Sequence, residues 1–185
     1  MDGIIQRGVL VLLACIGAGC SHTPRPVIVD RFYQADGRPV WSQPRYMGDD
    51  KRRVLHGTAR YWYRSGGPQD RISYRHGVLQ GGWTHWYEHG PKAFTCTYRD
   101  GVLHGAVTVW DGEGMSVCSG IYRYGSEHEG SFYRPAPEGS GPACMAGEVV
   151  TVKEGNTVNN TAITDLSAEA VVALRVFWER TPPNY

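Results

Sequence analysis

Short runs in which hydrophobic and polar residues alternate, bounded by glycine-rich turns, fill the middle of the chain. Between residues 92 and 98, Phe94, Cys96 and Tyr98 fall on one side and threonines fall on the other. This two-residue period is typical of a β-strand. The preceding run, residues 81–87, is rich in aromatic residues and also favours a strand. The two runs are separated by a short turn, so the pattern predicts a β-hairpin.

The hairpin unit recurs every 24 residues from residue 54 to about residue 133. A fixed period of this size indicates a stacked repeat, and pairs such as Asp100-Gly101 are strong hairpin signals. A lone hairpin is marginal in water. We therefore expect buried aromatic columns to stack the units into an elongated antiparallel meander. The columns expected to be structural are Trp62, Trp86 and Trp110, and Gly57, Gly81 and Gly105.

The unit resembles the MORN repeat, in the bacterial variant that is often labelled antitoxin-like. Leu55-His56-Gly57 and Leu103-His104-Gly105 carry the resemblance, together with the tryptophan column and the Tyr-Arg-Asp-Gly close of the second unit. Gln80 departs from the pattern, since it stands where His is usual, and the fourth unit, from Gly125, is degenerate. The resemblance implies a curved sheet that serves as an interaction surface toward proteins or membrane lipids.

The first 19 residues have the pattern of a signal peptide, because an apolar run at 8–16 is too short to span a bilayer. The run ends in Gly17-Ala18-Gly19-Cys20, which resembles the lipobox of bacterial lipoproteins. Gly17 departs from the usual Leu. The resemblance implies cleavage before Cys20, two acyl chains on its sulfur and a lipid anchor in a membrane of the bacterial cell envelope. The alternatives are a secreted protein with an unmodified Cys20 and an uncleaved membrane anchor.

The segments that flank the repeats have a different composition. Residues 20–53 contain prolines that break long regular elements, and we expect a tether with one short strand. Beyond the repeat sheet of residues 54–134, the region 135–185 is expected to form a linker, two strands at 148–153 and 157–163, and one helix at 166–179. The helix is expected to pack against the last hairpins; the alternative is a docking helix. The predicted fold is mainly β with one C-terminal helix.

The chemistry of the chain favours a binding protein over an enzyme. The formal net charge of +1 gives no general attraction to nucleic acid. No metal-ligand spacing, phosphate loop or serine elbow is present, so we expect no cofactor, no metal and no catalytic residues. An exported chain favours disulfides, and Cys118 with Cys144 is the candidate pair.

The sequence therefore predicts a lipoprotein tethered in the envelope, whose repeat sheet is a non-catalytic scaffold for an unknown envelope protein or glycan. The alternatives are a lipid-binding module and an envelope enzyme without a recognisable motif. The candidate interaction surface is Arg60, Tyr74, Arg75, Tyr98, Arg99, Tyr122 and Arg123.

Overall fold

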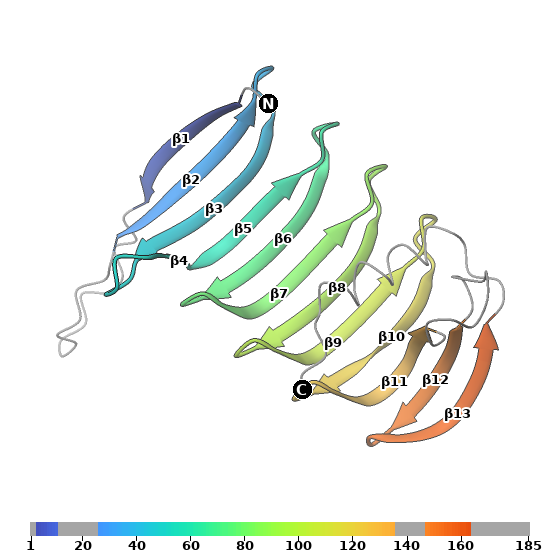
Figure 1. Ribbon diagram of the computed structural model, residues 1–185. Helices are drawn as coiled ribbons and strands as arrows, with labels where there is room; N and C mark the ends of the chain where they lie inside the picture. The colour runs from blue at the N-terminus through green and yellow to red at the C-terminus, as the bar shows by residue number, and fades with distance from the viewer. Residues whose placement is uncertain (1–2, 11–25, 136–146, 164–185) are drawn as a thin grey trace.

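The computed structural model describes residues 3–10, 26–135 and 147–163, which form one open antiparallel sheet (Figure 1). In chain order the strands are β1 (Gly3–Leu10), β2 (Val27–Gln34), β3 (Pro39–Met47), β4 (Arg53–Leu55), β5 (Gly57–Trp62), β6 (Pro68–Arg75), β7 (Val78–Trp86), β8 (Lys92–Arg99), β9 (Val102–Trp110), β10 (Ser116–Arg123), β11 (Ser126–Pro135), β12 (Gly147–Lys153) and β13 (Asn156–Ile163). Consecutive strands pair in chain order, except that β4 pairs only with β3 and β5 also pairs with β3.

The predicted meander is confirmed for the described residues, and so are the two strands expected after the linker. The expected helix at 166–179 lies outside the described residues, as do Cys20 and Cys144. No helix in the described part of the chain is long and apolar enough to cross a membrane.

The short strand expected within residues 20–53 is present as β2, but the expectation of a tether is wrong for residues 27–47, because β2 and β3 form a hairpin within the sheet. Two prolines suggested irregular structure, but each occupies a position in β3 that a strand tolerates. Pro39 is the first residue of β3. Pro44 lies beside the break between β4 and β5, where its carbonyl accepts from His56 N at 2.9 Å. Proline is confined to such strand starts and irregular positions, because it lacks a main-chain donor.

Strand β1 falls inside the stretch expected to be a signal peptide. Its eight residues pair with β2 from Gly3↔Gln34 to Leu10↔Val27. The signal peptide remains a prediction. Cleavage before Cys20 would remove β1 and leave β2 as the edge strand of the sheet.

The turns explain a second set of repeat glycines, separate from Gly57, Gly81 and Gly105. His76-Gly77, Asp100-Gly101 and Tyr124-Gly125 all have positive φ at both positions, between 51° and 85°. This is the type I′ geometry that matches the twist of a hairpin. In each turn, the N–H of the first turn residue donates a hydrogen bond to a side chain of the previous hairpin. The acceptors are His56, Gln80 and His104, at 3.3, 2.7 and 3.3 Å. Gln80 therefore replaces His as an equivalent hydrogen-bond acceptor.

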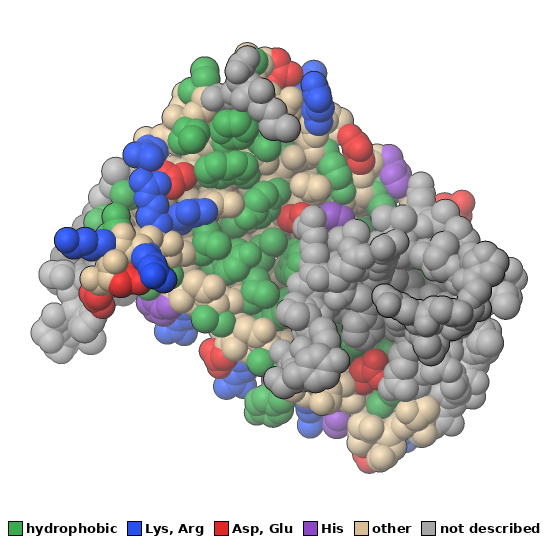
Figure 2. Space-filling view, in the orientation of Figure 1, with side chains coloured by type: hydrophobic (Ala, Val, Ile, Leu, Met, Phe, Trp, Pro, Cys, Tyr) green, Lys and Arg blue, Asp and Glu red, His purple; other side chains and the backbone are tan. Residues whose placement is uncertain are grey.

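The hydrophobic core lies on one face of the sheet, which we call the core face. The expected alternation in β8 is confirmed, because Phe94, Cys96 and Tyr98 are at most 4% exposed. Aromatic rings pack across the strands: Trp83 lies 5.3 Å from Phe94, and Tyr122 lies 5.1 Å from Phe132, between centroids. Figure 2 shows hydrophobic side chains gathered in a band over the middle of this face.

The tryptophan column is periodic, as predicted, but it is not part of this core. Trp62, Trp86 and Trp110 each end a strand of the repeat (β5, β7 and β9), and all three are half-buried. Successive residues of a strand point to opposite faces. Trp83 and His85 are on the core face, so Trp86 is on the other face. We call this second face the tryptophan face.

Candidate functional site

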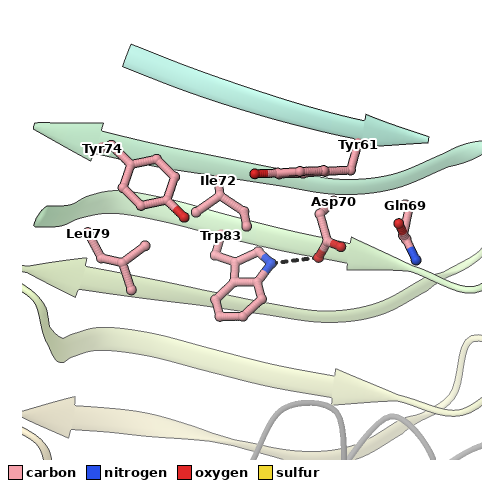
Figure 3. Close-up of a pocket in the computed structure, with 7 residues that line it drawn as sticks. All are labelled: Tyr61, Gln69, Asp70, Ile72, Tyr74, Leu79 and Trp83. Atoms are coloured by element: carbon pink, nitrogen blue, oxygen red, sulfur yellow. Dashed lines mark hydrogen bonds between the residues drawn. The ribbon is translucent and has the colours of Figure 1, made fainter. Parts of the chain in front are cut away.

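Two places on the sheet hold side chains that are suited to binding, one on each face. The first is an open groove on the core face, with a volume of about 370 Å³ (Figure 3). It crosses β5, β6 and β7. Its lining residues are Tyr61, Gln69, Asp70, Ile72, Tyr74, Leu79 and Trp83.

A buried carboxylate at the groove holds two side chains together. Asp70, 3% exposed, accepts a hydrogen bond from Trp83 Nε1 at 2.8 Å, and its Oδ1 lies 2.8 Å from His85 Nδ1. His85 stacks on Phe94 at 5.2 Å between centroids. A buried carboxylate is costly unless donors surround it. These two contacts converge on Asp70 Oδ1 and fix the orientation of the Trp83 ring.

An aspartate next to a histidine is also a common arrangement for acid–base chemistry. The other nitrogen, His85 Nε2, faces the Tyr63 hydroxyl at 3.5 Å, but that hydroxyl donates to Trp86 O at 2.6 Å. Both His85 and Asp70 are packed among aromatic rings. The contacts of this group therefore favour a structural network that orders the groove.

Burial also changes the acidity of tyrosines along the core face. The pKa of Tyr74 is raised by burial, and Tyr61 and Asp70 raise it further. Burial raises the pKa of Tyr98, with a further contribution from the neighbouring Cys96 thiol. Both phenols therefore stay neutral at physiological pH, and they contribute apolar surface rather than charge.

The predicted interaction surface of tyrosine and arginine is divided between the two faces. Tyr98 and Tyr122 are core residues, each 4% exposed, so they offer no docking surface. Tyr74 lines the groove. The arginines that follow these tyrosines, Arg75, Arg99 and Arg123, are exposed strand-end residues on the tryptophan face. The predicted residues therefore do not form one continuous surface, because adjacent residues of a strand face opposite ways.

The second place is on the tryptophan face, where polar residues pair across the sheet in one continuous row. Each member lies directly opposite the next in the strand register, from β1 to β12. We call this the polar row, and no member is a carboxylate or a large apolar residue. Its members are Gln6, Arg31, Ser42, Arg60, Arg71, Thr84, Thr95, Thr108, Ser119, Ser131 and Thr151.

The polar row lies beside the tryptophan column. Arg60 and Trp62 line an open depression of about 340 Å³ with Arg31 and Tyr33. The Arg71 guanidinium carbon lies 6.0 Å from the centroid of the Trp86 ring. These contacts place positive charge and aromatic surface side by side on the tryptophan face.

The three arginines of the row lack acidic partners. All are exposed, and no carboxylate of the described residues forms an ion pair with any of them. Arg60 and Arg71 are directly opposite each other, and like charges in this position destabilise a sheet. Sequence reasoning selected Arg60 but missed Arg31 and Arg71, since neither occupies the same repeat position as Arg60. Their alignment depends on strand register.

The cysteines that the structure describes are both core residues. Burial raises the pKa of the Cys96 thiol to about 12, so its reactive thiolate is scarce at neutral pH. Cys118 is 7% exposed in β10. Strand β9 lies between the strands of Cys96 and Cys118. The proposed pairing of Cys118 with Cys144 stays a prediction, since Cys144 lies outside the described residues.

No group of histidine, cysteine and acidic side chains within the described ranges is arranged to hold a metal ion. Comparison of the chain with protein-family models, with curated proteins and with solved structures found no match in any of the three.

Proposed function

We propose that this protein is a non-catalytic binding scaffold, tethered to a membrane of the bacterial envelope through a lipidated Cys20. One observation carries the proposal. The sheet buries its aromatic core on one face and displays the tryptophan column and most of the polar row along the other, where Ser42 and Thr84 are the buried members of the row. A surface that extends over several repeats suits a large partner better than a small substrate, which typically needs a concave, mostly enclosed pocket.

The near-neutral charge helps to separate this proposal from a lipid-binding module. A net charge of +1 provides little attraction to anionic lipid headgroups. In the proposal the acyl chains supply membrane attachment, so the sheet is free to bind something else. Two acyl chains suffice for stable anchoring, whereas one gives only marginal binding.

Mass spectrometry of the mature N-terminus tests the anchor. We expect the chain isolated from membranes to begin at Cys20 with two acyl groups. A Cys20→Ser variant is expected to leave the membrane fraction. A chain that still begins at Met1, and so retains β1, would refute the lipoprotein proposal.

Site-specific photo-crosslinking in cells tests the scaffold. A photoreactive residue at Ala106, which is exposed on the tryptophan face, is expected to give a reproducible adduct. The control is Met115, which is 67% exposed in a turn. Adducts of equal yield at both positions, or none at either, would contradict a specific binding surface.

A further inference from the structure

The tryptophan column has a spacing that points to a particular kind of polymer. Trp62, Trp86 and Trp110 end β5, β7 and β9, so consecutive rings are two strands apart. Strands are spaced by about 4.8 Å, which separates consecutive rings by roughly 10 Å. These strands run in similar directions in Figure 1. A partner that contacts all three rings therefore has to present an apolar surface at this interval.

An extended β-1,4-linked glycan has this property. Each sugar in such a chain is turned over relative to the previous one, so the same ring face recurs at every second sugar. The length of two extended sugars is comparable to two strand spacings. The C–H-rich face of a pyranose ring packs well on an aromatic ring, and half-buried tryptophans are held in place while part of each ring stays accessible.

The polar row supplies hydrogen-bonding groups next to the rings. Thr95, Thr108 and Ser119 occupy consecutive strands, and each is at least partly exposed. A hydroxyl both donates and accepts, so these groups can bond sugar hydroxyls and amides directly or through water.

The arginines add a preference for acidic sugars. Arg31, Arg60 and Arg71 lie at the β2–β6 end of the row, and no described carboxylate neutralises them. A guanidinium binds a carboxylate through two parallel hydrogen bonds. An anion bound there would relieve the repulsion between Arg60 and Arg71.

We propose that the tryptophan face binds an extended β-1,4-linked glycan that carries carboxylates, with sugar rings stacked on Trp62, Trp86 and Trp110. This inference depends on the proposed scaffold function and names its partner. A protein partner would not require a regular interval between rings, so the geometry favours the glycan.

The binding test uses the full-length chain in detergent and three soluble probes. The first is a peptide-free strand of alternating N-acetylglucosamine and N-acetylmuramic acid, which is β-1,4-linked and acidic. The second is a chitin oligomer, which has the same linkage and no carboxylate. The third is maltoheptaose, whose α-1,4 linkage produces a coiled chain. By calorimetry we expect the acidic strand to bind most tightly, the chitin oligomer more weakly and maltoheptaose not at all.

Chain length gives a test that requires no variant. Three rings at every second sugar span about five sugars, so affinity should rise up to that length and then level off. Affinity that is independent of length, or equal for maltoheptaose and the β-linked chains, would overturn the proposal.

Two matched sets of variants test the separate roles of the tryptophans and the arginines in glycan binding. Trp86→Ala should weaken binding of the acidic strand by about tenfold, whereas Trp86→Phe, which keeps a ring, should retain most of it. Tyr124→Ala removes a 75% exposed ring outside the column and should have no effect. Arg60→Ala should reduce the preference for the acidic strand over chitin, and Arg52→Ala, in a turn, should not. Thermal unfolding of each variant checks that the sheet is intact.

The outcomes separate this inference from the proposed function. If none of the glycans binds but Ala106 crosslinks to one protein, the glycan inference is wrong and the scaffold proposal stands. If crosslinking at Ala106 yields no adduct and Cys20 carries no lipid, the proposed function itself is wrong.

Discussion

The two faces of the sheet are built from the same strands and have opposite characters. On the core face, Trp83, Phe94 and Tyr98 are at most 4% exposed and pack ring against ring. On the tryptophan face, Trp86 is half-buried beside Arg71 and a row of hydroxyls. The contrast shows that a repeat period alone does not distinguish a core column from a surface column. The position of each residue in the strand alternation decides it.

The two faces also differ in how their polar side chains are paired. The core face must exclude water, and its buried carboxylate, Asp70, is paired with Trp83 and His85. The tryptophan face has no such requirement, yet it keeps three arginines without acidic partners in the described chain. Like charges held opposite each other cost stability, so these arginines are candidates for recognition.

The largest expected difference between the faces is in the free energy of unfolding of two tryptophan variants. Trp83→Ala removes a core ring and the donor to Asp70, and should cost about 3–5 kcal/mol. Trp86→Ala, three residues away on the other face, should cost about half as much or less, because its ring is only half-buried. Urea unfolding monitored by circular dichroism measures both. Equal losses would show that the tryptophan column is part of the core.

The general architecture could be predicted from the sequence because its signals are local. The alternation of Phe94, Cys96 and Tyr98 and the turn at Asp100-Gly101 identify a hairpin without knowledge of the rest of the chain. The β2–β3 hairpin was missed, since Pro39 and Pro44 are acceptable only where the strand starts and where its partner changes.

The candidate sites were harder to predict because they depend on register. Arg60 and Arg71 become neighbours only when β5 and β6 pair with a bulge between Tyr61 and Trp62. Asp70 and His85 are likewise brought together across β6 and β7. No spacing in the sequence predicts these pairs, because a shift by one residue would send each side chain to the other face.

The next largest effect on the free energy of unfolding should come from Asp70, the buried carboxylate of the core face. The Trp83 and His85 contacts share Asp70 Oδ1, so Asp70→Asn can keep both on its amide oxygen but removes the negative charge that strengthens them. We expect a loss of about 1–3 kcal/mol in unfolding free energy. The control is Asp100→Asn in an exposed turn, which should change stability little. A stable Asp70→Asn variant would show that the network does not order the groove.

Two adjacent glycines, Gly81 and Gly82, test whether the backbone conformation of the sheet requires glycine at the repeat position. Gly81 has φ +92° and lies opposite Tyr98, whereas a Cβ on its neighbour Gly82 would meet nothing within 4 Å. Gly81→Ala should cost roughly 1–2 kcal/mol, since a side chain disfavours positive φ. Gly82→Ala should be close to neutral. Similar thermal shifts for both variants would argue against a conformational role for the glycine column.

The smallest expected effect on the free energy of unfolding at neutral pH involves the Cys96 thiol. Because this thiol is buried on the core face, its titration reports on that face alone. Burial raises its pKa from 9.0 to about 12, so the folded state favours the neutral thiol. Its contribution to stability is complete below pH 9 and is lost as the pH rises from 9 toward 12. Urea unfolding at pH 7 to 10 should therefore show a steeper loss of stability for the native chain than for Cys96→Ala, in which Tyr74 keeps its titration and Tyr98 loses only the part of its raised pKa that the Cys96 thiol contributes. At pH 8, Cys96 should resist iodoacetamide until urea unfolds the sheet, and rapid alkylation of the folded chain would mean that the core face opens to solvent.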